Sequence, residues 1–268
     1  MAGQKTRQNI WLTTMTDQAF FEFDEVSFAY NRGAKILSNI DWYITEGAFH
    51  CLVGLSGCGK TTLLKLAAGL LLPTKGEVRI GGELVRKPSQ KVGFVFQNPA
   101  LLDWLPVIDN VLLSISLQRL VQAEDRDNAF EILELIGIAD LAKRYPRQLS
   151  GGQQSRVALA RGLLPAPPAL LMDEPFAALD AITREGLQDD VRRLVSLRNT
   201  TVLFVTHDIA EAVYLGDRVA VMEKGQITHT EKIDLKRISS KNFRYESDFS
   251  IFCQSIHEAL SNNMQVET

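Results

Sequence analysis

A glycine-rich run near residue 54 has the composition of a phosphate-binding loop. It reads Gly54-Leu55-Ser56-Gly57-Cys58-Gly59-Lys60-Thr61, followed by Thr62, and it fits the pattern G-x-x-x-x-G-K-[ST]. Glycines let such a loop wrap around an anion with its backbone N–H groups pointing inward. A helix beginning near Lys60 would turn the positive end of its dipole toward the same anion. The run therefore predicts a nucleotide site in which Lys60 reaches the β- and γ-phosphates and Thr61 holds Mg²⁺.

Two carboxylates end a short apolar run, Leu170-Leu171-Met172-Asp173-Glu174. A buried strand here would deliver both side chains to its C-terminal end, where open α/β sheets place their ligands. Asp173 is suited to hold Mg²⁺, and Glu174 is suited to accept a proton from an attacking water. An Asp-Glu pair alone is usually solvated surface, but the apolar run and the upstream phosphate-binding pattern favour a catalytic role.

A third run, Leu149-Ser150-Gly151-Gly152-Gln153, precedes a stretch with helical spacing from Gln154 to Leu164. Two glycines after a serine at a helix start can form a second anion site. Ser150 could equally be the N-cap of that helix, with no ligand involved. The residues alone leave both interpretations open.

The elements that would position these runs alternate between strands and helices. Apolar strands are expected at residues 49–53, 92–96, 169–172, 202–206 and 219–222. Apolar strands without polar alternation, spaced by helices, indicate a parallel sheet covered on both faces. Two earlier strands are expected at 20–27 and 36–44, and residues from about 98 to 160 read as helices inserted into the α/β core.

Composition excludes several classes of function. The chain has 268 residues, 46% of them apolar, and a formal net charge of −3, so no broad nucleic-acid footprint is expected. No stretch approaches the roughly 18 unbroken apolar residues of a membrane-spanning helix, and residues 1–18 read as a polar, flexible lead-in. Three cysteines without Cys-x-x-Cys spacing predict neither a disulfide framework nor a structural zinc site. Any membrane role would need a partner chain.

Taken in order, these runs resemble the ATPase subunits of ABC transporters, over roughly residues 20–230. The three runs are similar to the Walker A, Walker B and signature sequences of that family. Gln97 resembles the Q-loop glutamine, which would also contact Mg²⁺, and His207 resembles the switch histidine. Asp180, in Ala178-Leu179-Asp180, resembles the D-loop aspartate, and Tyr30 stands where the family has an aromatic residue that stacks on adenine. The resemblance implies an α/β fold, a P-loop NTPase core with an antiparallel β subdomain and an inserted helical subdomain, with ATP and Mg²⁺ as cofactors.

Some of these residues have simpler interpretations. Phe28 lies near Tyr30, and either could belong to the core; Asp180 could simply cap the next helix. Cys58, at a helix start, could have a lowered pKa and respond to oxidation, although packing alone is the favoured interpretation. Ser155 stands where many family members have Gln, and Ala177 where Ser or Gly is common. Neither is expected to touch phosphate.

The resemblance also implies a mechanism. Two subunits of this family pair head to tail, so a dimer is expected, of this chain with itself or with a related chain. Ser150 and Gly152 of one chain would close over the γ-phosphate held by the other. Glu174 would act as the base, and His207 would stabilise charge on the γ-phosphate in the transition state. Gln97 would sense Mg²⁺ and the attacking water and link the site to the helical insertion.

Residues 96–111, together with Pro175-Phe176, resemble the subgroup that powers uptake of nitrate, taurine, alkanesulfonates and related small anions. This implies a motor subunit at the cytoplasmic face of the inner membrane, bound to transmembrane permease subunits and indirectly to a solute-binding protein, with no nucleic-acid partner. Trp104 would then lie near the permease-contacting surface, or else be buried in the helical insertion. An exporter or lipid-transporter subunit and a soluble ABC ATPase remain alternatives.

The expected division of the chain is a lead-in at 1–18, an ATPase domain at 19–230 and a C-terminal extension at 231–268. The extension has one clear pattern, an apolar stripe at helical spacing formed by Phe249, Phe252, Cys253, Ile256 and Leu260. Such a stripe more often packs on its own domain than on a partner.

Overall fold

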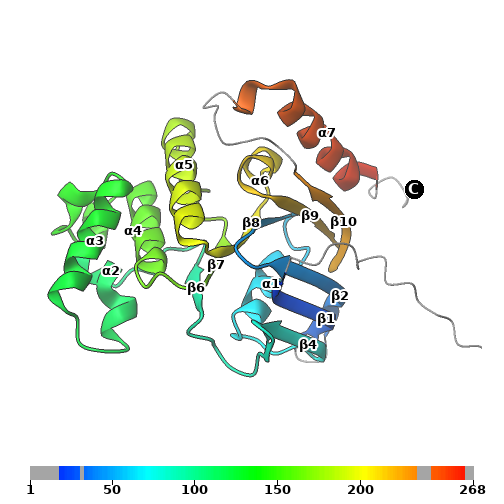
Figure 1. Cartoon of the computed structure of the whole chain (residues 1–268), viewed down its shortest axis with the longest axis horizontal. Helices are drawn as coiled ribbons and strands as arrows, with labels where there is room; N and C mark the ends of the chain where they lie inside the picture. Colours follow the sequence, from blue (N-terminus) through cyan, green and yellow to red (C-terminus); the bar gives the residue numbers. More distant parts are fainter. Residues whose placement is uncertain (1–17, 31–32, 234–242, 263–268) are drawn as a thin grey trace, which may run out of the picture.

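Two β-sheets form the centre of the molecule (Figure 1). The computed structural model describes residues 18–30, 33–233 and 243–262. The larger sheet has the order β10-β9-β3-β8-β7-β6, with the bounds Gln226–Lys232, Arg218–Glu223, Phe49–Val53, Thr201–Thr206, Ala169–Asp173 and Val92–Val95. Its neighbours pair in parallel, except that β10 is antiparallel to β9. The parallel sheet expected from the apolar runs is confirmed, whereas strand β10 was not expected.

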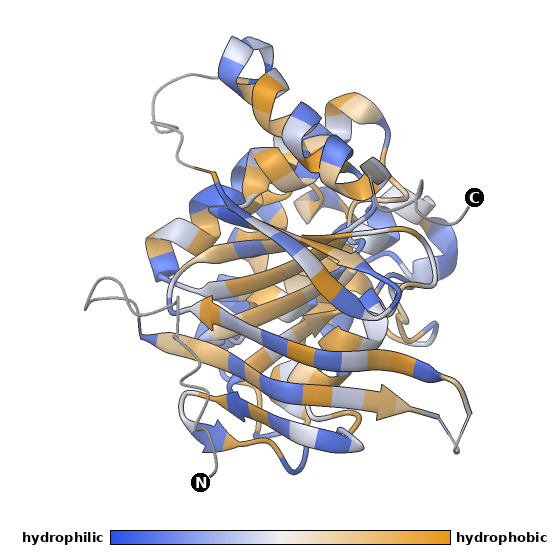
Figure 2. Ribbon diagram, turned by 90° about the vertical axis from the view of Figure 1, so that its right-hand side faces the viewer, coloured by the Kyte–Doolittle hydropathy of each residue, from blue (hydrophilic) through white to orange (hydrophobic). Residues whose placement is uncertain are grey.

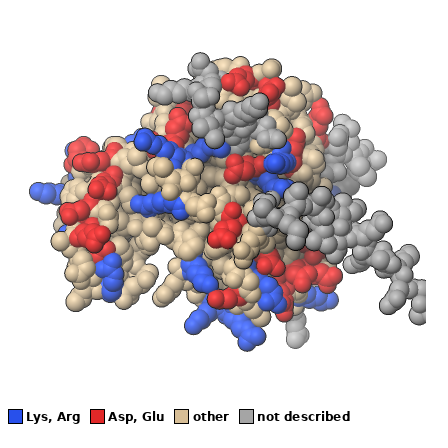
Figure 3. Space-filling view, in the orientation of Figure 1, with Lys and Arg blue, Asp and Glu red and all other residues tan. Residues whose placement is uncertain are grey.

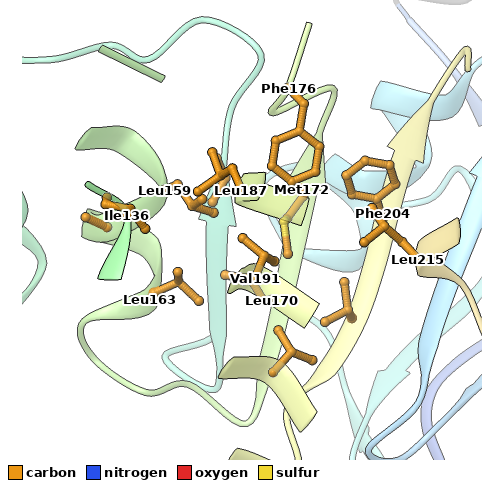
Figure 4. Close-up of a cluster of buried hydrophobic side chains, with 14 of the residues drawn as sticks. Ile136, Leu159, Leu163, Leu170, Met172, Phe176, Leu187, Val191, Phe204 and Leu215 are labelled. Atoms are coloured by element: carbon orange, nitrogen blue, oxygen red, sulfur yellow. The ribbon is translucent and has the colours of Figure 1, made fainter. Parts of the chain in front are cut away.

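The central strands are apolar throughout because both faces of the sheet are covered. Every residue of β3, β7 and β8 is buried. On β7, Leu170 and Met172 join one core cluster and Leu171 joins the other, on the opposite face. Figure 4 shows the first cluster, in which the rings of Phe176 and Phe204 lie 5.6 Å apart beside Met172. These contacts fix the ends of β7 and β8, where the candidate catalytic residues lie.

The smaller sheet is antiparallel and has the order β2-β1-β4-β5, with the bounds Lys35–Thr45, Ala19–Ala29, Lys75–Ile80 and Glu83–Leu84. Hydrophilic and hydrophobic residues alternate along its longer strands (Figure 2). The buried side chains of this sheet share a core cluster with helix α1 (Lys60–Ala67) and with one face of the larger sheet. The antiparallel β subdomain implied by the family resemblance is therefore present.

Helices occupy the chain between β6 and β7 and lie together at the left of Figure 1. They are α2 (Val107–Ser116), α3 (Ala123–Leu135), the 3-10 turns η1 (Ala139–Leu141) and η2 (Pro146–Gln148), and α4 (Gly151–Leu163). The predicted helical insertion is thus observed, but one boundary was wrong. The helix expected to begin at Gln154 begins at Gly151, because Ser150 and Gln153 form a reciprocal capping box over its first turn.

After β7 the chain adds α5 (Ala181–Arg198) and α6 (Ile209–Leu215), and later η3 (Phe243–Tyr245) and α7 (Ser247–Asn262). Helix α7 lies over α6 (Figure 1). Its predicted stripe packs on the domain as expected: Phe249 and Ile256 are buried, and Phe252, Cys253 and Leu260 pack against the same cluster. Among the described residues no helix is both long and apolar enough to cross a bilayer. Except for Gln18, the expected lead-in lies outside the described residues, and the domain boundaries stay predictions.

Candidate active site

The predicted phosphate-binding loop connects β3 to α1, in the expected order of strand, glycine turn and helix. Gly57 and Gly59 have φ angles of 81° and 110°, which side chains with a Cβ rarely adopt. Gly54 is constrained differently, since a Cβ there would lie 2.3 Å from the carbonyl oxygen of Met222 and 2.8 Å from Cys58 Sγ. Ser56 is exposed at the tip of the loop. The loop can therefore approach an anion with its backbone, as the sequence pattern predicts.

Lys60 and Thr61 begin α1 and hold the polar groups of the loop together. The Lys60 ammonium donates to the carbonyl oxygens of Gly54 at 2.7 Å and Leu55 at 2.9 Å. The Thr61 hydroxyl donates to Asp173 Oδ1 at 3.2 Å. Thr62 is buried in α1. The hydroxyl and the carboxylate that were predicted to hold Mg²⁺ are thus adjacent, although they come from different elements.

Asp173 ends β7 and is buried. Burial raises the pKa of its carboxyl group, while the Thr61 hydroxyl, Lys65 and Lys60 lower it and Glu174 raises it further. A buried carboxylate beside a second carboxylate favours a cation nearby. The oxygen donors at this position therefore fit Mg²⁺.

Glu174 is the residue on which three predicted catalytic side chains converge. Gln97 Nε2 donates to Glu174 Oε2 at 3.4 Å, and His207 Nδ1 lies 3.1 Å from the same oxygen. Gln97, Glu174 and His207 follow β6, β7 and β8, which are neighbouring strands. Glu174 has a φ angle of 45°, and its N–H donates to the carbonyl oxygen of Val205 at 2.9 Å. A carboxylate held in this way can accept a proton from an attacking water molecule.

The signature-like run and Asp180 lie elsewhere in the chain's own fold. Ser150 Oγ accepts from the N–H of Gln153 at 3.3 Å, and Asp180 Oδ1 accepts from the N–H of Thr183 at 3.0 Å. Both residues are therefore N-caps, and the bond from Thr183 lowers the pKa of Asp180. A Cβ on Gly152 would lie 3.0 Å from Leu179 Cδ2, whereas one on Gly151 would meet nothing within 4 Å. In Figure 1, α4 lies well away from α1, so one chain does not bring these residues to its own phosphate-binding loop.

The surroundings of Tyr30 and Cys58 decide whether Tyr30 or Phe28 belongs to the core and whether Cys58 is suited to redox chemistry or to packing. Phe28 is 6% exposed and belongs to the core, whereas Tyr30 is 46% exposed and meets it edge-on, with ring centroids 4.8 Å apart. The tyrosine is therefore the one available to a ligand. Burial raises the pKa of the Cys58 thiol, which favours packing over redox reactivity.

Trp104 is 72% exposed, so the interpretation as a buried tryptophan was wrong. Asn110 is fully buried and holds the preceding loop: its amide accepts from the N–H of Leu102 at 2.8 Å and donates to the carbonyl oxygen of Leu105 at 2.8 Å. These bonds fix the segment that carries Trp104 outward. Sequence reasoning missed Asn110, and an isolated polar residue in a helical stretch gives no signal for such a role.

Sequence reasoning also missed the residues that hold the D-loop and the His207 loop together. Arg184 Nη2 donates to the carbonyl oxygen of Leu179 at 2.9 Å. The same guanidinium lies 3.7 Å from Asp208 Oδ2 and 3.7 Å from Glu211 Oε1. Glu211 lies in the first turn of α6, just after the loop that carries His207, and an acidic residue at that place in a helix gives no sign of this role.

Taken together, a phosphate-binding loop, a buried aspartate beside the loop's threonine, and a glutamate contacted by a glutamine and a histidine define an α/β ATPase. The family model described as "ABC transporter" matches residues 37–177, and the chain belongs to that family. A solved dimer of the cassette MJ0796 in a post-hydrolysis state with ADP and phosphate has 34% sequence identity and a TM-score of 0.74. It covers 80% of this chain and 99% of that one.

Two curated relatives are similar over most of their length. The bicarbonate transport ATP-binding protein CmpD of Synechocystis sp. is 39% identical over 84% of this chain and 83% of its own. The aliphatic sulfonates import ATP-binding protein SsuB 1 of Xanthomonas axonopodis pv. citri is 46% identical over 76% of this chain and 82% of its own. The chain is thus an ATP-binding subunit of the ABC transporter family and an ATP hydrolase of that type.

Proposed function

We propose that this chain drives the uptake of a small anion by hydrolysing ATP beneath a separate membrane-spanning permease. The observation that carries the hydrolytic part is the convergence of Gln97 and His207 on one oxygen of Glu174, beside the Thr61–Asp173 pair. The direction of transport and the class of cargo rest on the relatives, whose names include bicarbonate transport and aliphatic sulfonate import.

In the proposed reaction, the loop from Gly54 to Thr61 binds the phosphates of ATP with its N–H groups and with Lys60, which exchanges the loop carbonyls for phosphate oxygens. Thr61, Asp173 and Gln97 would hold Mg²⁺, which would supply positive charge beside the phosphates. Glu174 accepts the proton of the attacking water. His207 stabilises the charge that develops on the γ-phosphate. Tyr30 stacks on the adenine.

Each site is completed by a second subunit. The run from Ser150 to Gln153 lies on the helical side of the fold, away from the chain's own loop, which supports a head-to-tail pair in which Ser150 and Gly152 of one chain cap the γ-phosphate of the other. Asp180 takes part in the same interface while it caps α5. The closed pair of subunits opens after hydrolysis, and this movement is passed to a partner protein.

The proposed partner is a permease at the cytoplasmic face of the inner membrane, with a solute-binding protein supplying the cargo. Exposed Trp104, at the end of a loop fixed by Asn110, is a candidate contact for that permease. Lysine, arginine and acidic side chains are interspersed on the face shown in Figure 3, with no broad area of one sign. This distribution favours a protein partner over nucleic acid.

The first test is ATP hydrolysis by the purified chain over a range of protein concentrations, with the Glu174→Gln variant as control. We expect a specific rate that rises with concentration and disappears in the variant. A flat rate that does not depend on Glu174 would contradict the shared-site mechanism.

The second test is transport. Vesicles that enclose the chain and ATP, with its permease in the membrane and the solute-binding protein outside, should take up bicarbonate, nitrate or a sulfonate only when ATP is present. ATP-dependent movement of solute away from the side of this subunit would instead support the exporter alternative.

A further inference from the structure

A chain of polar side chains connects the C-terminal segment to the loop that carries His207. In η3, Arg244 Nη2 donates to Gln188 Oε1 on α5. The other end of that amide, Gln188 Nε2, donates to Glu211 Oε1 at 3.1 Å. Glu211 Oε2 in turn accepts from the Thr206 hydroxyl at 2.7 Å. Three of the four members are almost completely buried, with exposed fractions of 0% for Gln188, 7% for Glu211 and 2% for Thr206.

The Thr206 end of this relay fixes the backbone on both sides of His207. Thr206 is the last residue of β8, and its hydroxyl oxygen also accepts from the N–H of Asp208 at 3.0 Å. Asp208 Oδ1 accepts from the N–H of Ala210 at 2.8 Å and so caps α6. The Thr206 hydroxyl therefore ties the loop that presents His207 to the Glu211 carboxylate, beside the Arg184 guanidinium that contacts both Asp208 and Glu211.

The Arg244 end is anchored on α6. The guanidinium carbon of Arg244 lies 3.6 Å from the ring centroid of Tyr214. The neighbouring Phe243 stacks on the same tyrosine, with centroids 6.1 Å apart, and meets Phe249 of α7 edge-on. These contacts hold Arg244 over the buried amide of Gln188.

We propose that Arg244 is a positioning residue for His207, acting through Gln188, Glu211 and Thr206. Gln188 Nε2 can donate to the Glu211 carboxylate only while Gln188 Oε1 points away from Glu211. In that orientation Arg244 is the donor to Gln188 Oε1. Without Arg244, a buried amide oxygen loses its partner, which is costly in a site of low dielectric. The amide is then held at one end only, so the geometry of its bond to Glu211, and with it the bond from Thr206 to Glu211, is no longer fixed. The C-terminal segment thus contributes to hydrolysis through α5, α6 and β8, and its helix α7 also lines a hollow beside His207 with Cys253 and His257.

The inference rests on the role proposed above for His207, and the experiment tests the two separately. The full chain is prepared as Arg244→Met, which keeps an unbranched apolar stem but removes the guanidinium and its donors. Tyr245→Ala is the matched control, because Tyr245 is the next residue and is 81% exposed. We expect Arg244→Met to lower kcat about tenfold with KM for ATP within about twofold, since a misplacement of about 1 Å can cost about 100-fold in rate. Tyr245→Ala should keep the parent kcat.

A spectroscopic measurement separates positioning from a general loss of structure. The sequence has four histidines, so the ring resonance of His207 can be assigned by NMR with single substitutions. It should shift in Arg244→Met and in Gln188→Leu and stay in place in Tyr245→Ala. The double variant Arg244→Met with Gln188→Leu should be no slower than either single variant, because both break one chain of contacts. Arg244→Lys, which keeps a charged donor, should recover part of the rate.

The outcomes that overturn the inference are distinct. If His207→Ala keeps the parent rate, the role proposed for His207 is wrong and the inference fails with it. If His207→Ala loses activity while Arg244→Met keeps kcat within twofold, the role of His207 stands and the relay is refuted. A loss of kcat in Arg244→Met with an unmoved His207 resonance, or with an equal rise in KM, would also refute positioning.

Discussion

Replacing Gly151 with alanine should stabilise the isolated subunit and still impair shared-site hydrolysis. Gly151 is the first residue of α4, and a Cβ there would meet no atom within 4 Å. Its φ angle is not positive, so alanine fits the backbone. Such a Gly→Ala change stabilises by about 0.4–1 kcal/mol, mainly by restricting the unfolded chain. For a protein of roughly this size, this corresponds to a melting temperature about 1–4 °C higher.

The same methyl group should be harmful in the pair of subunits. In the proposed dimer the N–H groups at the start of α4 approach the γ-phosphate bound by the partner, and a methyl group on that surface would separate them. We expect ATP hydrolysis to fall at least about tenfold, because loss of one donor to a developing charge typically costs about 100-fold or more. Binding of ATP to the chain's own loop should be unchanged.

Two measurements on the same preparation test this argument, namely thermal unfolding without nucleotide and hydrolysis as a function of protein concentration. Gly186→Ala is the matched control, because Gly186 is exposed on α5 and a Cβ there also meets nothing within 4 Å. The control should be stabilised to a similar degree and keep its hydrolysis. A Gly151→Ala variant that hydrolyses ATP within twofold of the parent would show that α4 does not face a phosphate. A lower melting temperature of the Gly151→Ala variant would show that the space beside the Gly151 Cα is occupied by other atoms.

Three further changes have defined outcomes. Gly54→Ala should lower the free energy of unfolding by about 1–3 kcal/mol, because the new Cβ would lie 2.3 Å from the Met222 carbonyl oxygen. Thermal unfolding should show the loss of stability, and a nucleotide titration should show weaker ATP binding. A variant with the parent's stability and affinity would contradict this. Burial raises the pKa of Asp173, so the folded protein binds this proton more tightly than the unfolded chain, and stability falls as pH rises from about 4 to the raised pKa and is level above it. Asp173→Asn should remove that slope and raise the melting temperature of the nucleotide-free protein at neutral pH while hydrolysis is lost; an equal slope in the variant would count against the burial argument. Because the pKa of Cys58 is also raised, peroxide should leave the ATPase rate unchanged, and a peroxide loss that Cys58→Ser prevents would refute the packing interpretation.

The sequence was informative where the constraint on a residue is local. The phosphate-binding loop, the apolar strands and the stripe on α7 each follow from a short run of residues, because glycine conformation and the spacing of apolar side chains act over one turn or one strand. The start of α4 was misplaced for a related reason. The apolar spacing placed the helix from Gln154 onward, whereas the capping box of Ser150 and Gln153 begins it at Gly151.

The contacts among catalytic residues could be expected only as far as the order of the strands was known. Gln97 and Glu174 are 77 residues apart, and they meet because β6 and β7 are neighbours in the sheet. No periodic pattern in the sequence specifies that order; the family resemblance assigned the residues to one site without giving the order of the strands. Arg184 lies outside the family motifs, and Asn110 lies in the segment 96–111 without a role assigned by the resemblance, so the contacts of both were missed.

The relay from Arg244 to Thr206 shows the limit most clearly. Its members come from η3, α5, α6 and β8, and each is an ordinary polar residue in its own segment. Gln188 gives no sign in the sequence that it is buried, since it stands on a helix among charged neighbours. It becomes informative only when its two amide ends are seen between a guanidinium and a carboxylate. A buried amide with both ends bonded has one favourable orientation, and that orientation physically links the last part of the described chain to the histidine beside Glu174.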